Sequence, residues 1–165
     1  SFDTYIEYTT NDNLKGIIGI EVKYTERGYG LKKDSTQETA IKEKTSKYYT
    51  VSQQSKLYKP EAIDELTSDK YRQVWRNQLL GESILITDRN KFKYFTSITI
   101  FPQANSHFVE TSKDYIDMLT SNNLKFIPIT YEEFFSVCEK HCPDSRYQKW
   151  LSYLITRYLV PDEDE

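Results

Sequence analysis

The segment 16–24, GIIGIEVKY, constrains the fold most, because it reads as a buried strand that carries two charges. Its residues are almost continuously Ile, Val and Gly, a pattern typical of a strand covered on both faces. Side chains alternate faces along a strand, so Glu21 and Lys23 share one face with Gly19. Charges in such a strand cost free energy unless they are paired or bind a ligand, which makes this Glu-x-Lys pair a functional candidate. The opposite face carries Ile18, Ile20 and Val22, which we expect to point into a core.

A preceding strand brings a further carboxylate toward this pair. Residues 3–10, DTYIEYTT, alternate polar and apolar side chains, and NDNLK at 11–15 is typical of a turn. Together the two strands predict an antiparallel hairpin, in which Asp3 lies opposite Glu21 or Lys23. Directly opposite residues have Cβ atoms about 5 Å apart and diagonal ones about 7–8 Å apart.

Two carboxylates at this separation can share a divalent cation. Mg²⁺ binds few carboxylates together with water and phosphate oxygens, so Asp3 and Glu21 would suffice, with the Val22 carbonyl as a further ligand. Lys23 would hold the attacking water, stabilise the charge that develops at phosphorus, or act as the base if its pKa is depressed. Glu7 shares the face of Asp3 but lies roughly 13 Å along the strand, too far for the same metal. The structural alternative is a simple cross-strand ion pair.

Helical and strand patterns alternate through the rest of the chain, which indicates an α/β fold. The patterns predict helices over 68–83 and 112–122 and strands over 92–101 and 124–130, the last an edge strand because of Pro128. A capping box, Thr130 with Glu133, opens a helix that runs through Cys142. The last helix carries an amphipathic stripe that we assign to core packing: Tyr147, Trp150, Leu151, Leu154, Ile155, Tyr158 and Leu159.

Residues 26–60 form a polar segment rich in Lys and Tyr. One interpretation is a solvated excursion with short helical pieces. The other is a basic, aromatic arm that touches phosphates and stacks bases, with Lys32 and Lys33 as contacts. We treat the segment as an insertion in a single domain over 1–160, followed by an acidic tail at 161–165.

Composition limits the class of protein. The 165 residues carry a formal net charge of −3, which argues against a protein that coats nucleic acid but leaves room for local contacts. No apolar run has the length of a bilayer span, and we expect a cytoplasmic protein without membrane contact. Cys138 and Cys142 bracket His141 with too few ligands for a metal site, so we interpret them as reduced thiols.

Three stretches, SFDTYIEY, IGIEVKYTE and QVWRNQLL, resemble a bacterial branch of the PD-(D/E)XK, or restriction-endonuclease-like, superfamily. Members of that branch have a Ser-x-Asp-x-x-x-Glu-Tyr strand, an Ile-Glu-x-Lys-Tyr strand and a helix with Gln-x-x-Arg. The match spans most of the chain, although these three segments alone are specific.

The resemblance implies a mixed central β-sheet flanked by helices and a nuclease that uses Mg²⁺ or Mn²⁺. Asp3 would match the motif Asp, and Glu21 with Lys23 the E-x-K. Gln73 would match the helix Gln that reaches back toward the site, and Arg76 would contact a phosphate. Because the superfamily core begins with a helix and a strand before the Asp-bearing strand, we expect this chain to lack both.

The resemblance leaves the partner open. DNA is the expected substrate, but the sequence does not discriminate it from RNA, because the metal mechanism acts on the phosphate and not on the sugar. A catalytically inactive binding or scaffold module with the same fold is the alternative from another class, and the negative net charge motivates it. A two-strand cut needs two sites, which makes a homodimer conceivable.

Overall fold

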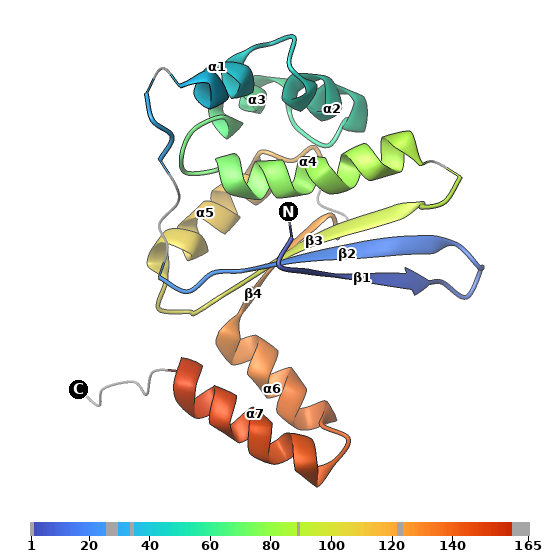
Figure 1. Ribbon diagram of the computed structural model, residues 1–165, viewed down its shortest axis with the longest axis vertical. Helices are drawn as coiled ribbons and strands as arrows, with labels where there is room; N and C mark the ends of the chain where they lie inside the picture. Colours follow the sequence, from blue (N-terminus) through green and yellow to red (C-terminus); the bar gives the residue numbers. More distant parts are fainter. Residues whose placement is uncertain (1, 26–29, 34, 89, 122–123, 160–165) are drawn as a thin grey trace.

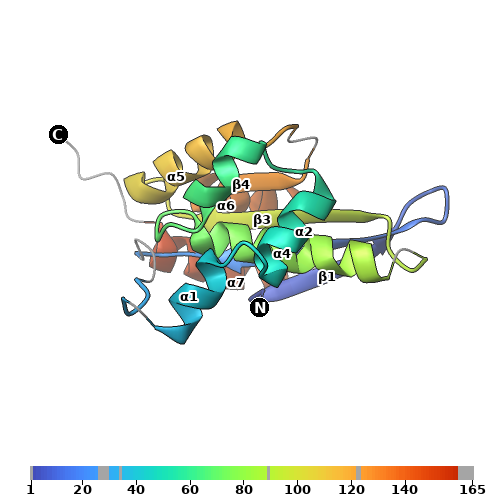
Figure 2. The same cartoon turned by 90° about the horizontal axis from the view of Figure 1, so that it is seen from above.

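The computed structural model describes residues 2–25, 30–33, 35–88, 90–121 and 124–159, which form a mixed sheet with helices on both faces (Figures 1 and 2). The strands, in order across the sheet, are β1 (Thr4–Thr9), β2 (Lys15–Val22), β3 (Tyr94–Phe101) and β4 (Phe126–Thr130). β1 is antiparallel to β2, whereas β2, β3 and β4 run parallel. The α/β fold with a mixed sheet that the sequence predicted is confirmed.

The hairpin of β1 and β2 sets the register of the sheet. Its turn contains Asn13 in the left-handed conformation, with φ of 60°, which Asn tolerates better than most residues. The paired residues of the hairpin end with Thr4 and Ile20, and Asp3 lies one residue before Thr4. A hydrogen bond of 3.0 Å from the Asp3 amide to the Ile20 carbonyl holds Asp3 against β2.

Helices cover the two faces of the sheet unequally (Figure 1). One face carries α1 (Thr36–Lys42), α2 (Lys47–Ser55), the short 3₁₀ helix Pro60–Ala62, α3 (Ile63–Leu66), α4 (Arg72–Thr87) and α5 (Ser106–Asp117). The other carries α6 (Tyr131–His141) and α7 (Ser145–Tyr158). In the described part of the chain, no helix has both the length and the apolar composition for a bilayer span.

Two helices begin elsewhere than predicted. α4 begins at Arg72 instead of at 68, because the residues before it form a turn. α5 begins at Ser106 instead of at 112, because the Asn105 side chain accepts a hydrogen bond of 3.2 Å from the Phe108 amide and caps the helix there. The capping box of Thr130 and the edge position of β4 are both confirmed.

The expected short helical pieces are present in the segment 35–60, but the expectation that it is only a solvated excursion was wrong, because several of its side chains are buried in the core. Residues 26–29 and 34 lie outside the described residues. The rest forms α1 and α2, and α2 packs on α4, where the Trp75 indole donates a hydrogen bond of 3.0 Å to the Ser52 hydroxyl. Because lysines dominate the composition of this segment, its sequence pattern did not reveal the apolar residues that are buried: Ile41, Tyr49, Leu57 and Tyr58.

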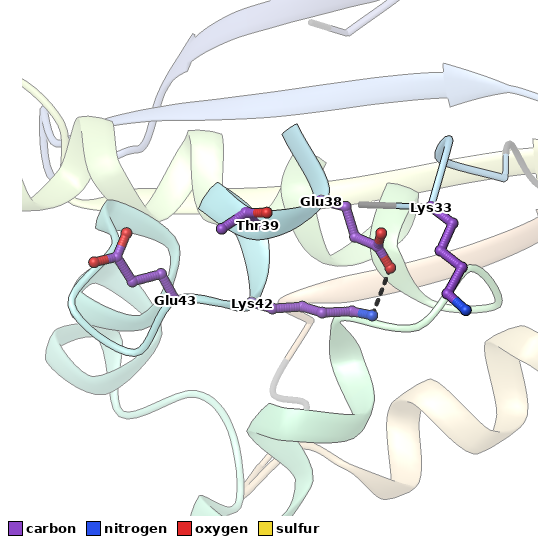
Figure 3. A pocket seen from close by; sticks show the side chains of 5 residues that line it. All are labelled: Lys33, Glu38, Thr39, Lys42 and Glu43. Atoms are coloured by element: carbon purple, nitrogen blue, oxygen red, sulfur yellow. Dashed lines mark hydrogen bonds and ion pairs between the residues drawn. The ribbon is translucent and has the colours of Figure 1, made fainter. Parts of the chain in front are cut away.

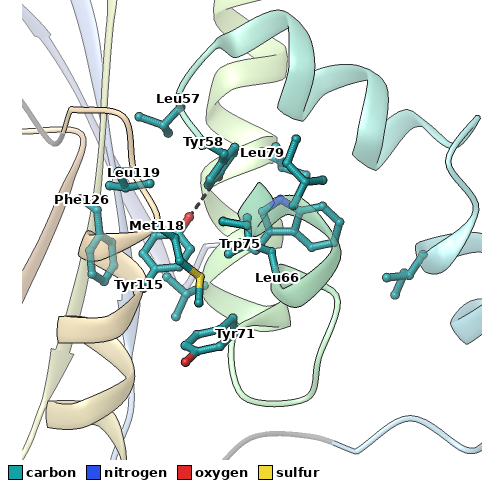
Figure 4. Close-up of a cluster of buried hydrophobic side chains, with 14 of the residues drawn as sticks. Leu57, Tyr58, Leu66, Tyr71, Trp75, Leu79, Tyr115, Met118, Leu119 and Phe126 are labelled. Carbon is teal, nitrogen blue, oxygen red and sulfur yellow. Dashed lines mark hydrogen bonds between the residues drawn. The ribbon is translucent and has the colours of Figure 1, made fainter. Parts of the chain in front are cut away.

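The main core lies between this helical layer and the sheet, around Trp75, Tyr115 and Phe126 (Figure 4). α4 approaches β3 closely because position 81 has no side chain. A Cβ built at Gly81 would lie 2.2 Å from the Phe95 ring, far inside van der Waals contact. Gly81 therefore sets the distance between α4 and the sheet.

The stripe of the last helix enters the core only in part. Leu151 is buried with Tyr131, Phe135 and Ile100 in a second cluster. Tyr147 and Trp150, by contrast, are largely exposed, so their assignment to core packing was wrong. A helical stripe in the sequence is wider than the surface that α6 and the sheet offer to α7, and its edge stays in solvent.

We predict that Gly81→Ala destabilises the protein by about 1–3 kcal/mol, because overpacking against Phe95 outweighs the gain of about 1 kcal/mol in helix propensity. Urea unfolding measures the change. Phe95→Leu should offset much of it, so the double variant should lose less stability than the two single changes together. A more stable Gly81→Ala protein would contradict the close approach.

Alkaline pH should also weaken the fold. The Tyr58 and Tyr115 hydroxyls pair at 3.0 Å, and burial raises the pKa of both. Burial and a hydrogen bond to Asp64 raise the pKa of Tyr49 to about 12. Phenols with raised folded-state pKa values stabilise the fold fully below their unfolded pKa of about 10, and this stability is lost as pH rises toward the folded values.

The measurement is the free energy of unfolding in urea at pH values below and above about 10. The Tyr58→Phe/Tyr115→Phe protein should lose less stability over this range than the wild-type protein. Equal slopes would mean that these phenols do not carry the alkaline dependence.

Candidate active site

The predicted site residues gather where β2 ends. Ligands of open α/β sheets bind outside the carboxyl ends of parallel strands, and β2, β3 and β4 all end at this edge. Glu21 is the second-last residue of β2, and the Lys23 amide extends the ladder by donating to the Ile100 carbonyl at 2.8 Å. Both side chains are therefore held on regular strand backbone.

Glu21 and Lys23 form a buried ion pair. The Lys23 ammonium lies 2.6 Å from Glu21 Oε1, and the two residues are only 4% and 8% exposed. Removing such charges from water costs several kcal/mol per ion before their attraction is counted. The pair therefore contributes little to stability by itself, which keeps Glu21 and Lys23 candidates for a functional role.

Gln73 joins the pair from the helical layer. Its side-chain amide nitrogen donates to Glu21 Oε1 at 2.9 Å, so the lysine and the glutamine share one carboxylate oxygen. The Gln73 carbonyl oxygen is buried and has no hydrogen-bond partner among the described residues. Because Gln73 lies in the first turn of α4, the close packing of this helix on β3 holds the amide over the end of β2.

Asp3 reaches the same place from β1. Its carboxylate Oδ2 accepts a hydrogen bond of 2.7 Å from the Val22 amide. This contact fixes one oxygen of the exposed Asp3 carboxylate against the backbone of the residue that follows Glu21. Val22 itself was expected to point into a core, but its side chain is exposed, because it is the last residue of β2 and projects past the packed layer.

Sequence reasoning missed two residues at this edge. Thr99 is buried and pairs with Glu21 in the parallel ladder between β2 and β3, so the two side chains share a face. Asn105 donates from its side chain to the Tyr24 carbonyl at 3.0 Å and ties the chain after Lys23 to the start of α5. The position of Thr99 depends on the pairing of two strands far apart in the sequence, and the contact of Asn105 with Tyr24 joins segments 81 residues apart, so neither contact has a local signal.

The residues predicted to contact phosphates do not lie in the cluster around Glu21. Arg76 is exposed, and its guanidinium lies 5.9 Å from the centre of the Tyr48 ring. Lys32 and Lys33 are exposed, and Lys33 lines a shallow hollow along α1 with Glu38, Thr39, Lys42 and Glu43 (Figure 3). In this hollow Lys42 already pairs with Glu38 at 2.6 Å.

Few of the described side chains at this site could act as metal ligands. No group of three or more His, Cys, Asp or Glu side chains in the described ranges could hold a metal ion. Asp3 and Glu21 supply two carboxylates, a set that suits a hard cation completed by water and phosphate oxygens. Cys138 and Cys142 are free, partly buried thiols that pack in the second core cluster.

Comparison with known proteins assigns the family. The family model described as the PD-(D/E)XK nuclease superfamily matches residues 1–160. The chain belongs to the PD-(D/E)XK nuclease superfamily. No curated protein and no solved structure matches it significantly. Members of this superfamily are generally nucleases that use divalent metals, and the resemblance first seen in three short stretches extends through the last helix.

The cost of the buried pair can be measured. Lys23→Met should destabilise the protein by about 3–5 kcal/mol, because the Glu21 carboxylate stays buried without its cation. The Glu21→Gln/Lys23→Met double variant should recover much of that loss. Urea unfolding in the presence of a chelator, with the wild-type protein, each single variant (Lys23→Met and Glu21→Gln) and the double variant, gives all four free energies. Additive changes would show that the two side chains do not interact.

Proposed function

We propose that this protein is a metal-dependent nuclease that hydrolyses phosphodiester bonds, with DNA as its substrate and Asp3, Glu21, Lys23 and Gln73 as its active site. The observation that carries the proposal is the Glu21 carboxylate, which is buried at the end of a central strand and contacted by Lys23 and Gln73, with the Asp3 carboxylate bound to the amide of the next residue, Val22. Membership of a superfamily of nucleases supports the reaction class.

The residues fit a Mg²⁺ or Mn²⁺ ion. Lys23 and Gln73 both contact Oε1 of Glu21, and the Val22 amide contacts Oδ2 of Asp3, so each carboxylate has its second oxygen to offer. The Val22 carbonyl would be a third ligand from the protein. A divalent cation bound here would lower the pKa of water and neutralise charge on the scissile phosphate.

The protein groups have distinct roles in this proposal. Gln73 and the Val22 amide are positioning groups, because each holds one oxygen of a carboxylate in place. Lys23 carries a fixed positive charge at the end of β2, where it would hold the attacking water and stabilise the negative charge that develops on the phosphoryl oxygens. Burial strengthens this effect, because the local dielectric is low.

Cleavage assays with supercoiled plasmid, single-stranded DNA and RNA, each with Mg²⁺ and then Mn²⁺, test the proposal. Asp3→Asn, Glu21→Gln and Lys23→Met should each lower the rate about 100-fold or more, because each removes charge that acts on the reacting phosphate. A chelator should abolish cleavage by the wild-type protein.

Glu7→Gln is the matched control. Glu7 is an exposed carboxylate on β1, four residues beyond Asp3, and it pairs with Ile17 far from the end of β2. This variant should cut at the wild-type rate. A Lys23→Met protein that cut as fast as the wild type would refute the proposed mechanism. Metal binding without cleavage of any substrate would favour a binding or scaffold module, and cleavage of RNA alone would change the substrate.

A further inference from the structure

α7 exposes a row of aromatic rings that the proposed active site does not use. Tyr147, Trp150 and Tyr153 are 55%, 61% and 57% exposed, and each lies three residues beyond the one before. This spacing puts them on one side of the helix, over about 9 Å of its axis. Indole and phenol rings left this far in water are costly, and a row of them marks a surface that binds something.

The charges on the same helix are all positive. The residues Ser145–Tyr158 include Arg146, Lys149 and Arg157 and contain no Asp or Glu. This contrasts with the net charge of −3 for the whole chain. Arg146 pairs with Asp144, the residue that caps the helix, at 2.7 Å. The surface therefore combines exposed rings with cations, within a protein that is acidic overall.

Arg157 is held in a defined position beside these rings. Its Nη1 donates to the Tyr153 hydroxyl at 2.9 Å, and its guanidinium lies 5.5 Å from the centre of the Tyr158 ring. A guanidinium held in this way loses little further conformational freedom when it binds a ligand. Its planar set of donors also matches the geometry of a phosphate. The aliphatic side chains of α7 do not take part, because Leu151, Leu154 and Ile155 pack in the second core cluster.

The C-terminal end of α7 lies against the residue that follows Lys23. Tyr158, at the end of α7, lies edge-on to Tyr24 with ring centres 6.1 Å apart. Tyr24 directly follows Lys23 in the chain and also stacks on Tyr131 at 6.2 Å. A strand of nucleic acid lying on α7 would thus be led toward the end of β2.

We propose that the Tyr147, Trp150 and Tyr153 face of α7 binds single-stranded nucleic acid, with bases stacked on the rings and phosphates at Lys149 and Arg157. Unpaired bases have exposed faces that can stack on aromatic side chains, whereas the bases of a duplex do not. A partner helix with an aliphatic face would be expected to bind an aliphatic stripe, which this face of α7 does not have. The cations on the face, by contrast, match the phosphates of a nucleic acid. The inference rests on the proposed function for the use of this surface, but binding itself does not require cleavage.

Binding is measured by fluorescence anisotropy with a labelled oligodeoxynucleotide of about 12 nucleotides, in chelator, so that no hydrolysis occurs. Trp150→Leu and Tyr153→Leu should each weaken binding about tenfold, since stacking on one base is lost while an apolar side chain remains. Trp150→Phe, which keeps a ring, should retain most of the affinity. Lys149→Gln/Arg157→Gln should weaken binding and reduce its salt dependence.

Each result decides for or against the inference separately from the nuclease proposal. If Lys23→Met binds like the wild type while the α7 variants bind weakly, the surface is a nucleic-acid site whether or not the protein cleaves. If the α7 variants bind like the wild type, or the wild type does not bind, the inference is wrong. Light scattering that shows a wild-type dimer dissociated by Trp150→Leu, with binding unchanged, would assign the face to a second copy instead.

Discussion

The close approach of α4 to β3 is the constraint on which the arrangement of this protein depends. Gly81 allows the helix to lie against the Phe95 ring, where any side chain would clash. Two turns earlier on the same helix, Gln73 then reaches Glu21 with a hydrogen bond of 2.9 Å. Trp75, buried on the other side, fixes the rotation of α4 through α2 and Ser52. A helix held further away would leave the carboxylate without this contact.

The burial of the ion pair of Glu21 and Lys23 costs free energy, because both charges leave water. Burial of both charges weakens the fold unless their attraction and hydrogen bonds offset the loss of water, and similar pairs replaced by apolar residues often leave proteins as stable or more so. The large core of the α4 layer tolerates this cost. Active sites commonly trade stability for charge that is already in place when the substrate arrives.

The end of β2 joins the two helical layers. Glu21 faces α4 through Gln73, whereas Tyr24, just past the strand, packs on Tyr131 and Tyr158 of the layer formed by α6 and α7. The two sides differ in character, because the first is a buried polar cluster and the second an aromatic one. This placement puts the proposed chemistry and the proposed nucleic-acid surface within reach of the same short stretch of backbone.

The sequence by itself determined the elements whose causes are local: the hairpin, the shared face of Glu21 and Lys23, and the Thr130 capping box. Alternation along a strand and a tight turn suffice to predict that Asp3 lies near the end of the strand that carries Glu21. Only the tertiary structure decided that the Lys-rich segment enters the core, that Thr99 lies beside Glu21, and that Trp150 stays in solvent. These depend on which distant surfaces meet, and neither composition nor periodicity encodes how much of a face its neighbour will cover.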